Sequence, residues 1–366
     1  MRAPVRFAIV GCGRIAGNHL EAVRELPRAR LVGVCDLIPD RAQAYGERYG
    51  LPWYRDYHEL LTREEADVVC LLTPSGMHPR HAVDIIQRYG KHLVIEKPLA
   101  LRLQDLAWMH GAAEAAGVKM FPVYQNRYNR AVQVVRLALQ DGRLGKPVLG
   151  TVRVRWCRTQ RYYDRDPWRG TWSLDGGALT NQGIHYLDLL LYVLGDVEWV
   201  AAATATQLVN VEVEDTAVAA LRFANGALGV VEVTTAARPD DFEASISVLA
   251  ERGTAVLSGI ACNELATWTL EPGRLAEYSE EFPNAYGLGH KPLLDDVVAD
   301  LLDGITHPVS FAEGSRAVRL LNAIYRSAED GLPVRLSDRP ESAQLGRDDP
   351  ALQALYVRLP RATVPK

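Results

Sequence analysis

The sequence predicts an α/β protein with a doubly wound parallel sheet first, then an α+β domain with an open, largely antiparallel sheet. The chain has 366 residues, and at roughly 100–200 residues per domain this length favours two domains. Short apolar runs alternate with helix-length segments up to residue 122, as in a parallel sheet covered on both faces. From about residue 197 several strand candidates follow one another without helices. We therefore expect domains at residues 1–122 and 123–335 and a C-terminal tail at 336–366.

The spacing of apolar runs sets the expected elements. In the first domain we expect strands at residues 5–10, 31–35, 68–72, 92–95 and 119–122, and helices at 15–26, 41–49, 79–89 and 103–115. Right-handed crossovers wind these helices onto both faces of the sheet. In the second domain we expect helices at 131–140 and 184–194, a strand at 147–156, and a hairpin of strands 217–223 and 227–234 around Asn225-Gly226. Two late helices, at 292–302 and 311–327, are expected to close this domain. The tail from residue 333 is expected to wrap the surface or to serve a subunit contact.

The composition excludes several functional classes. Hydrophobic residues make up 48% of the chain, enough for a sizeable core. The net charge of −4 argues against a general nucleic-acid binder, which needs a basic surface. Five cysteines without a C-x-x-C pair argue against a disulfide framework and favour a reducing cytoplasm. No apolar run approaches the ~20 residues that span a bilayer, and the N-terminus lacks a secretory pattern. We expect a cytoplasmic protein that binds neither nucleic acid nor membrane.

The strongest local motif is Gly11-Cys12-Gly13-Arg14-Ile15-Ala16, between the first strand and the first helix. It has the G-x-G-x-x-G/A form of a dinucleotide-binding turn. Gly11 permits the tight turn, Gly13 lets the backbone approach a pyrophosphate, and Ala16 permits close helix packing. Arg14 and Ile15 complete the turn, and the first helix amides then face the phosphates. The alternative is a glycine turn that binds nothing.

The end of the second strand carries Asp36. A carboxylate there accepts hydrogen bonds from both adenosine ribose hydroxyls and repels a 2′-phosphate, so NAD is favoured over NADP. Arg41 softens this preference if it meets a phosphate. The alternative for Asp36 is a helix-capping or solvated carboxylate.

The loop Thr73-Pro74-Ser75 follows the third strand and is expected to line the cofactor, because ligands bind beyond the carboxyl ends of strands in open α/β sheets. His78 and His81 lie in the next helix. The sequence shows no third ligand or nearby carboxylate for a metal, so we expect no metal and interpret both as solvated helix histidines. His78 also stays a candidate cofactor contact.

Glu96-Lys97-Pro98 follows the fourth strand. Pro98 cannot continue the ladder, so Lys97 lies at the carboxyl tip of the strand and faces the cofactor cleft. A desolvated ammonium has a lowered pKa and can share a proton with a substrate hydroxyl. Glu96 beside it is expected to contact the cofactor. The alternative for Lys97 is an ordinary surface lysine.

The segment from Gly176 to Asp188 carries the second half of this candidate site. Asn181 and His185 are four residues apart and share one face of a helix. A neutral His185 imidazole can accept the proton of an alcohol as hydride leaves the carbon. Asp188 either orients that ring or forms a salt bridge elsewhere. The alternative for His185 is a core histidine that caps a helix.

The combination of Gly11–Ala16, Glu96-Lys97-Pro98 and Asn181-x-x-x-His185 resembles the Gfo/Idh/MocA family of NAD(P)-dependent sugar dehydrogenases, over residues 1 to about 330. The resemblance implies a Rossmann domain and an open-sheet domain that often builds oligomers, so we expect a dimer or tetramer. It places Lys97 on the family's lysine and His185 on its catalytic histidine. Many members carry Asp where this chain has Asn181, and an asparagine there resembles the branch that oxidises C3 of UDP-N-acetylglucosaminuronic acid.

This departure predicts a neutral base. A carboxylate beside His185 would raise its pKa, whereas Asn181 orients the ring or the substrate without a negative charge. His185 should then stay neutral near pH 7. An Asn181→Asp variant with an unchanged pH profile would contradict this hypothesis.

Residues 153–172 are rich in arginine and aromatic side chains, which suit an anionic sugar or nucleotide sugar. A subunit interface or a solvated loop is the alternative. Residues expected to meet the nicotinamide or the substrate are Gln125, Arg127, Tyr163, Trp168, Arg169, Asn181 and His185, and, from the resemblance, His290.

These observations favour an NAD-dependent enzyme that oxidises a secondary hydroxyl of a sugar or nucleotide sugar, with Lys97 and His185 handling the proton. Two alternatives remain open: an inositol, free-aldose or glycoside dehydrogenase (or ketosugar reductase) of the same family, and a non-catalytic nucleotide-sensing regulator on the same fold.

Overall fold

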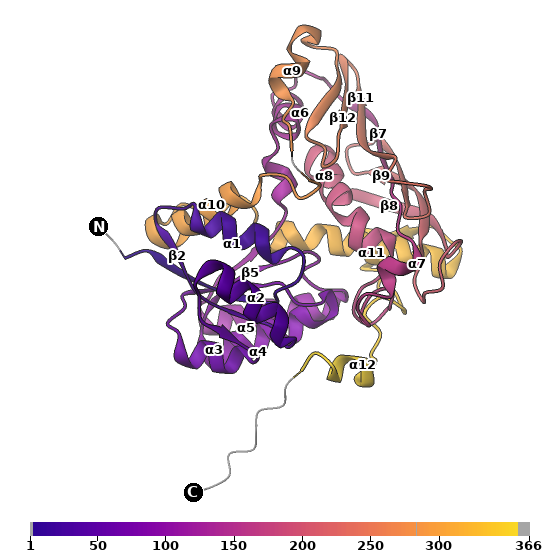
Figure 1. Cartoon of the computed structure of the whole chain (residues 1–366). Coiled ribbons are helices and arrows are strands. Elements are labelled where there is room, and N and C mark those ends of the chain that lie inside the picture. Colours follow the sequence, from indigo (N-terminus) through magenta and orange to yellow (C-terminus); the bar gives the residue numbers. More distant parts are fainter. Residues whose placement is uncertain (1–2, 283, 358–366) are drawn as a thin grey trace, which may run out of the picture.

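The computed structural model describes residues 3–282 and 284–357. Its first sheet, drawn in indigo and purple in Figure 1, is parallel and has the strand order β3-β2-β1-β4-β5-β6. This is the order of doubly wound dinucleotide-binding sheets. Successive strands are added on one side of β1 as far as β3 and on the other side from β4 onward, and such folds bind ligands where this order reverses, at the carboxyl ends of β1 and β4. The strands are β1 (Val5–Val10), β2 (Ala29–Cys35), β3 (Trp53–Tyr54), β4 (Val68–Leu71), β5 (His92–Ile95) and β6 (Met120–Pro122).

Helices cover both faces of this sheet. Apolar residues of α1 (Ala16–Arg24) and α10 (His290–Asp303) form the core on one face, and those of α3 (Tyr57–Arg63), α4 (His78–Tyr89) and α5 (Leu103–Ala116) form it on the other. The placement of α10 corrects the expectation that this late helix closes the second domain. Leu293, Leu294 and Val297 are fully buried against the first sheet, because the apolar stripe of α10 continues the surface of α1.

The second sheet has the order β13-β12-β11-β7-β10-β9-β8-β14, and all neighbours are antiparallel except β7 and β10. The predicted α/β architecture with a largely antiparallel second sheet is confirmed. Burial alternates along β9, so one face is buried and the other open. The strands are β7 (Pro147–Arg155), β8 (Val197–Ala205), β9 (Thr216–Phe223), β10 (Leu228–Thr234), β11 (Glu243–Ala250), β12 (Gly253–Ser258), β13 (Glu264–Trp268) and β14 (Val334–Arg335).

Helices α6 (Arg130–Gln140), α8 (Ile184–Leu194) and α11 (Phe311–Asp330) share one apolar core with the buried face of this sheet. The predicted hairpin is confirmed: Gly226 has φ +89°, and β9 and β10 pair across Asn225-Gly226. The sequence did not predict β3, α3, or the π-helical turn Leu179–Gly183 that precedes α8. The short elements are α2 (Pro39–Tyr49, predicted at 41–49), α7 (Gln160–Tyr163), α9 (Leu275–Tyr278), α12 (Pro350–Ala354) and 3₁₀ turns at Ser75–Met77, Gln125–Tyr128, Pro272–Arg274 and Leu336–Asp338.

The tail wraps across both halves of the molecule as far as it is described, and residues 358–366 of the predicted tail lie outside the described part. β14 pairs with β8, Gln353 Nε2 donates to Ser173 Oγ (3.3 Å), and the Tyr356 carbonyl accepts from His81 Nε2 (3.1 Å). Within residues 3–282 and 284–357, none of the helices combines the length and apolarity needed to cross a bilayer.

Candidate active site

The turn Gly11–Ala16 has the geometry of a phosphate cradle. Gly11 has φ +103°, and a Cβ there would lie 2.5 Å from the Leu72 carbonyl oxygen, so only glycine fits. At Gly13 an added Cβ would meet nothing within 4 Å, which leaves the backbone open to a ligand. Helix α1 begins at the fully buried Ala16 without a side-chain cap, so the positive end of the helix faces an anion bound at the turn, while Ala16 N and Asn18 N donate to Gly13 O (3.2 Å) and Ile15 O (3.0 Å). The turn therefore fits the pyrophosphate of a dinucleotide.

Asp36 is fixed to this turn. Its Oδ2 accepts from Cys12 N (2.8 Å) and its Oδ1 accepts from Ile38 N (2.8 Å). The carboxylate is half-buried beside Gly11–Ala16 at the end of β2, where adenosine ribose hydroxyls bind in such folds. The Arg41 guanidinium donates to Asp166 (2.7 Å) and so ties α2 to the loop after β7. Its charge is therefore matched by Asp166.

His78 and His81 are buried, so their interpretation as solvated histidines is wrong. The His78 ring bridges two backbone carbonyls, with Nδ1 2.8 Å from Pro98 O and Nε2 2.8 Å from Thr73 O. Both ring nitrogens are thus engaged, which argues against the predicted cofactor contact of His78. The bridge instead fixes the Thr73-Pro74-Ser75 loop to the segment that carries Lys97.

Lys97 lies directly after β5, half-buried, and its Nζ donates to the Asn181 carbonyl (2.7 Å). This bond joins the carboxyl end of the parallel sheet to the turn before α8. Burial lowers the pKa of Lys97, while the negative charges of Glu96 and Asp175 oppose that shift. The two predicted halves of the site are therefore in contact.

Asp175 is a site residue that the sequence did not predict. Its Oδ2 accepts from Gly170 N (2.8 Å), and its Oδ1 accepts from the Asn181 amide. The side chain is buried, which raises the pKa of Asp175 to about 6. The only sequence signal was a carboxylate next to Gly176-Gly177, where small residues permit close approach.

His185 is the second residue of α8 and is half-buried, with its ring edge-on to Tyr124 (centroids 6.3 Å apart). Burial lowers the pKa of His185 to about 3, and the positive charge of Lys97 lowers it further. The imidazole is therefore neutral near pH 7 and can accept a proton. The reason differs from the prediction: the Asn181 amide points to Asp175 rather than to the His185 ring, and burial keeps the imidazole neutral although the Glu96 carboxylate acts to raise its pKa.

Asp188 forms a salt bridge elsewhere, which was one of its two predicted roles. Its carboxylate binds the Arg127 guanidinium twice, at 2.6 Å and 2.8 Å, and both side chains are buried. Arg127 also contacts Glu313 (3.4 Å). Because the buried guanidinium is bonded to two carboxylates and lies over the Tyr192 ring, these contacts argue against the predicted contact between Arg127 and substrate.

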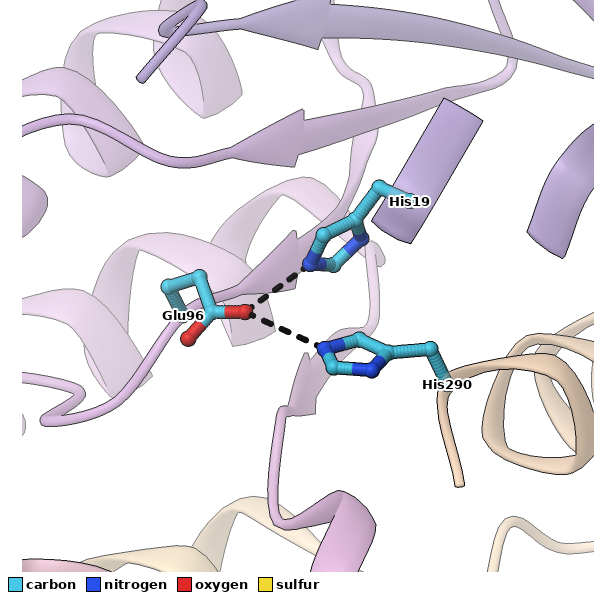
Figure 2. A group of neighbouring side chains, drawn as sticks. All are labelled: His19, Glu96 and His290. Carbon is cyan, nitrogen blue, oxygen red and sulfur yellow. Dashed lines mark hydrogen bonds and ion pairs between the residues drawn. The ribbon is translucent and has the colours of Figure 1, made fainter. Parts of the chain in front are cut away.

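Glu96 lies between two histidines from distant segments. His19 Nε2 lies 2.9 Å from Glu96 Oε1, and His290 Nε2 lies 3.8 Å from the same oxygen (Figure 2). These residue types can hold a metal, but the His19–Glu96 distance is that of a direct hydrogen bond. His290 and Glu96 are turned toward each other in the interior rather than toward open space, which argues against the predicted substrate contact of His290 and cofactor contact of Glu96.

Nearby, Gln125 Oε1 is buried without a partner in the described chain, as expected of a group that awaits a ligand.

The arginine-rich stretch divides into two parts. On β7, Arg155 pairs with Glu232 (2.5 Å) on the sheet and away from Lys97. In the loop after β7, Arg169 stacks on the rings of Tyr162 and Trp168 (both 4.5 Å), and its positive charge acts on Lys97. The Tyr163 hydroxyl bonds to Thr235 (3.1 Å), so its predicted substrate contact is not seen, whereas Trp168 and Arg169 remain candidates.

Comparison with known proteins identifies the family. The description "Oxidoreductase family, NAD-binding Rossmann fold" matches residues 5–124, and "GFO/IDH/MocA C-terminal domain" matches residues 132–256. The WlbA dehydrogenase from Bordetella pertussis, solved with NADH and UDP-GlcNAcA, is 40% identical with a TM-score of 0.86, over 92% of this chain and 98% of that chain. The chain belongs to the Gfo/Idh/MocA family.

Other Gfo/Idh/MocA-type relatives differ in what they act on. The WlbA dehydrogenase from Chromobacterium violaceum, also solved with NADH and UDP-GlcNAcA, is 38% identical with a TM-score of 0.84, over 92% of this chain and 96% of that chain. A D-apiose dehydrogenase from Paraburkholderia graminis is 34% identical over 237 residues, 63% of this chain and 60% of that protein. The family resemblance carried by Gly11–Ala16, Glu96-Lys97-Pro98 and Asn181/His185 is confirmed.

Proposed function

We propose that this protein uses NAD⁺ to oxidise a secondary hydroxyl of an anionic sugar, with a UDP-sugar uronate oxidised at C3 as the first candidate. One observation supports this best. The Lys97 ammonium donates to the Asn181 carbonyl one turn before His185, and its positive charge lowers the pKa of His185, so an ammonium and a neutral imidazole lie close together beyond the carboxyl end of β5.

The residues present fit a dinucleotide. The amides after Gly13 would hold the pyrophosphate, the Asp36 carboxylate the adenosine ribose, and the unpartnered Gln125 oxygen the nicotinamide end. Bound NAD⁺ supplies the hydride acceptor. The Asp36 carboxylate favours NAD over NADP, because it repels a 2′-phosphate.

The side chains handle the proton. His185 accepts the hydroxyl proton as the C–H bond breaks, so a C=O bond replaces the alcohol. Lys97 donates a hydrogen bond to the same oxygen and stabilises the negative charge that develops there. The positive charge of Lys97 also lowers the pKa of His185 and so helps to keep the imidazole in the neutral, accepting form.

Arg169 and Trp168 support an anionic substrate, since they place a guanidinium fork and an aromatic face beside Lys97. The likeness to dehydrogenases solved with UDP-GlcNAcA favours a nucleotide sugar, and that to a D-apiose dehydrogenase supports a free aldose as the second candidate. An inositol or glycoside is a further option. A non-catalytic regulator would need neither Lys97 nor His185.

We further propose a cytoplasmic homo-oligomer. The five cysteines of the sequence form no C-x-x-C pair, which fits a reducing compartment. The open face of the second sheet exposes Val218, Leu228 and Val230, an apolar surface that a second copy would cover.

The test is a substrate panel. The purified protein, NAD⁺ and each of UDP-GlcNAcA, UDP-GlcNAc, D-apiose, D-glucose and myo-inositol are mixed, and NADH formation is followed at 340 nm. We expect the UDP-sugar uronate to give the highest kcat/KM. A preference for a neutral sugar would contradict the proposed substrate class, and no NADH with any compound at enzyme-stoichiometric concentration would contradict the enzyme assignment.

A further inference from the structure

We infer that Glu214 and Tyr325 are positioning residues: together they hold the turn that sets Lys97 against His185. They lie in the segment before β9 and in α11, far from the catalytic residues in sequence. Neither belongs to any motif found in the sequence. Both are buried, Glu214 at 3% and Tyr325 at 1% exposure.

The contacts follow the backbone residue by residue. Ala178 N donates to the Glu214 carbonyl (3.1 Å), and Leu179 N donates to Glu214 Oε1 (2.9 Å). Gly177 N donates to the Tyr325 hydroxyl (3.3 Å), and Thr180 Oγ1 lies 2.9 Å from that hydroxyl. Each of the residues 177–180 is thus hydrogen-bonded to Glu214 or to Tyr325.

These bonds do the work of a helix cap. The first amides of a helix have no partner within the helix, and here the cap comes from two distant segments. Tyr325 donates to Glu214 Oε1 (2.9 Å), so the two side chains act as one unit. The fit is tight, because a Cβ on Gly177 would lie 1.6 Å from Glu214 Oε2. Any other residue at position 177 would displace the carboxyl group.

The held turn leads directly to the reacting groups. The Asn181 carbonyl, which accepts from Lys97 Nζ, follows Thr180, and His185 lies one turn further on. Between them the chain is π-helical over Leu179–Gly183, a conformation with poorer intrinsic stability that often marks functional sites. A shift of the turn would therefore move the Lys97 acceptor and the His185 ring together.

Burial also raises the pKa of Glu214 to about 8. The negative charge of Asp175 raises it further, while the Leu179 amide and the Tyr325 hydroxyl lower it. A protonated, neutral Glu214 suits an apolar interior.

The test uses Tyr325→Phe, which removes the hydroxyl and keeps the ring that packs on Trp172. The matched control is Tyr186→Phe: this tyrosine is equally buried, lies on α8, and its hydroxyl has no partner within the described residues. The first measurement is the rate of reductive methylation of Lys97, read by peptide mass spectrometry, which needs no substrate. We expect this rate to rise about threefold or more in Tyr325→Phe, because the acceptor of Lys97 moves, and to stay unchanged in Tyr186→Phe.

The second measurement rests on the proposed function. With the best substrate of the panel, kcat should fall about tenfold or more in Tyr325→Phe through misplacement of the reacting groups, while the NAD⁺ Kd stays within twofold. Glu214→Gln, which keeps an oxygen that can accept from Leu179 N, should lose less of the wild-type kcat than Glu214→Ala. Equal Lys97 methylation rates in wild type and Tyr325→Phe would overturn the inference. If no substrate is turned over but the Lys97 rate rises in Tyr325→Phe alone, the positioning role stands and the proposed function fails.

Discussion

The two sides of the candidate active site, here called the nucleotide wall and the helical wall, are built differently. The nucleotide wall (Gly11, Asp36 and Lys97) consists of residues that follow the carboxyl ends of β1, β2 and β5 in one parallel sheet, with Asp36 held by the nearby backbone amides of Cys12 and Ile38. The helical wall (Asp175, Asn181 and His185) follows a π-helical turn that is held by Glu214 and Tyr325 from far along the chain. The sheet places the first wall directly, whereas the second depends on tertiary contacts. A substitution in the nucleotide wall should therefore affect only the contacts of the substituted residue. A substitution in the contacts that hold the helical wall should also move other residues of that wall.

The largest effect is expected at the point where the walls meet. Lys97→Ala removes the ammonium that donates to the Asn181 carbonyl and that we propose to bind the substrate oxygen. We expect kcat to fall by ~10³-fold, within the range for a positioned proton-handling group, with NAD⁺ affinity retained. NADH formation gives kcat, and isothermal titration calorimetry gives the NAD⁺ Kd. Activity within tenfold of wild type would remove Lys97 from the reaction.

His185→Asn tests the base of the helical wall. We expect kcat to fall by ~10²-fold. Because the pKa of His185 is lowered to about 3, the ring is neutral above that pH and becomes charged only as pH falls toward it. We therefore expect the wild-type pH–rate profile to lack an inflection near pH 6.5 that comes from His185 and disappears in His185→Asn. Such an inflection would show that the imidazole titrates normally.

Asp36→Ser tests the nucleotide wall far from the reacting carbon. The variant loses the acceptor for ribose hydroxyls and the charge that repels a 2′-phosphate. We expect the KM for NAD⁺ to rise about tenfold, the preference to move toward NADP⁺, and kcat to stay within threefold. Asp40→Ser, in the first turn of α2, is the matched control. A large kcat loss in Asp36→Ser would contradict the local character of this wall.

The smallest effect is one of pH-dependent stability. Burial raises the pKa of Asp175 from 3.8 to about 6, so between these pH values the folded protein holds a proton that the unfolded chain releases. Asp175 therefore favours folding at low pH, and this contribution falls by ~3 kcal/mol as pH rises from about 4 to 6. Asp175→Asn should show a flatter curve of unfolding free energy against pH over that window, measured by urea unfolding. Parallel curves for the two proteins would contradict the burial of a protonated Asp175.

The difference between the two walls also explains which parts of the fold and of the site can be predicted from the sequence. The parallel sheet, the turn Gly11–Ala16 and the place of Lys97 follow from strand–turn–helix patterns, because parallel strands bring short motifs to one edge. The hairpin at Asn225-Gly226 follows from turn chemistry. Asn181 and His185 were found as a spaced pair, and the family resemblance drew on the same residues.

Contacts between distant segments were missed or misjudged. Nothing local in the sequence shows that Asp175 accepts a hydrogen bond from Asn181, that Arg127 forms a salt bridge with Asp188, or that His290 faces Glu96. The role of α10 was misassigned because an amphipathic pattern shows that a face is buried but not against what. His78 and His81 were taken as solvated because polarity alone does not reveal two backbone carbonyls placed around a ring.

The most direct test is a crystal structure of the wild-type protein with NADH and the hydroxyl form of its best substrate, a pair that cannot react. We predict that one substrate hydroxyl lies within about 3.2 Å of both Lys97 Nζ and a ring nitrogen of His185, with its carbon facing the nicotinamide C4. A substrate that places separate hydroxyls on the two side chains, or turns the carbon away from the nicotinamide, would contradict the account.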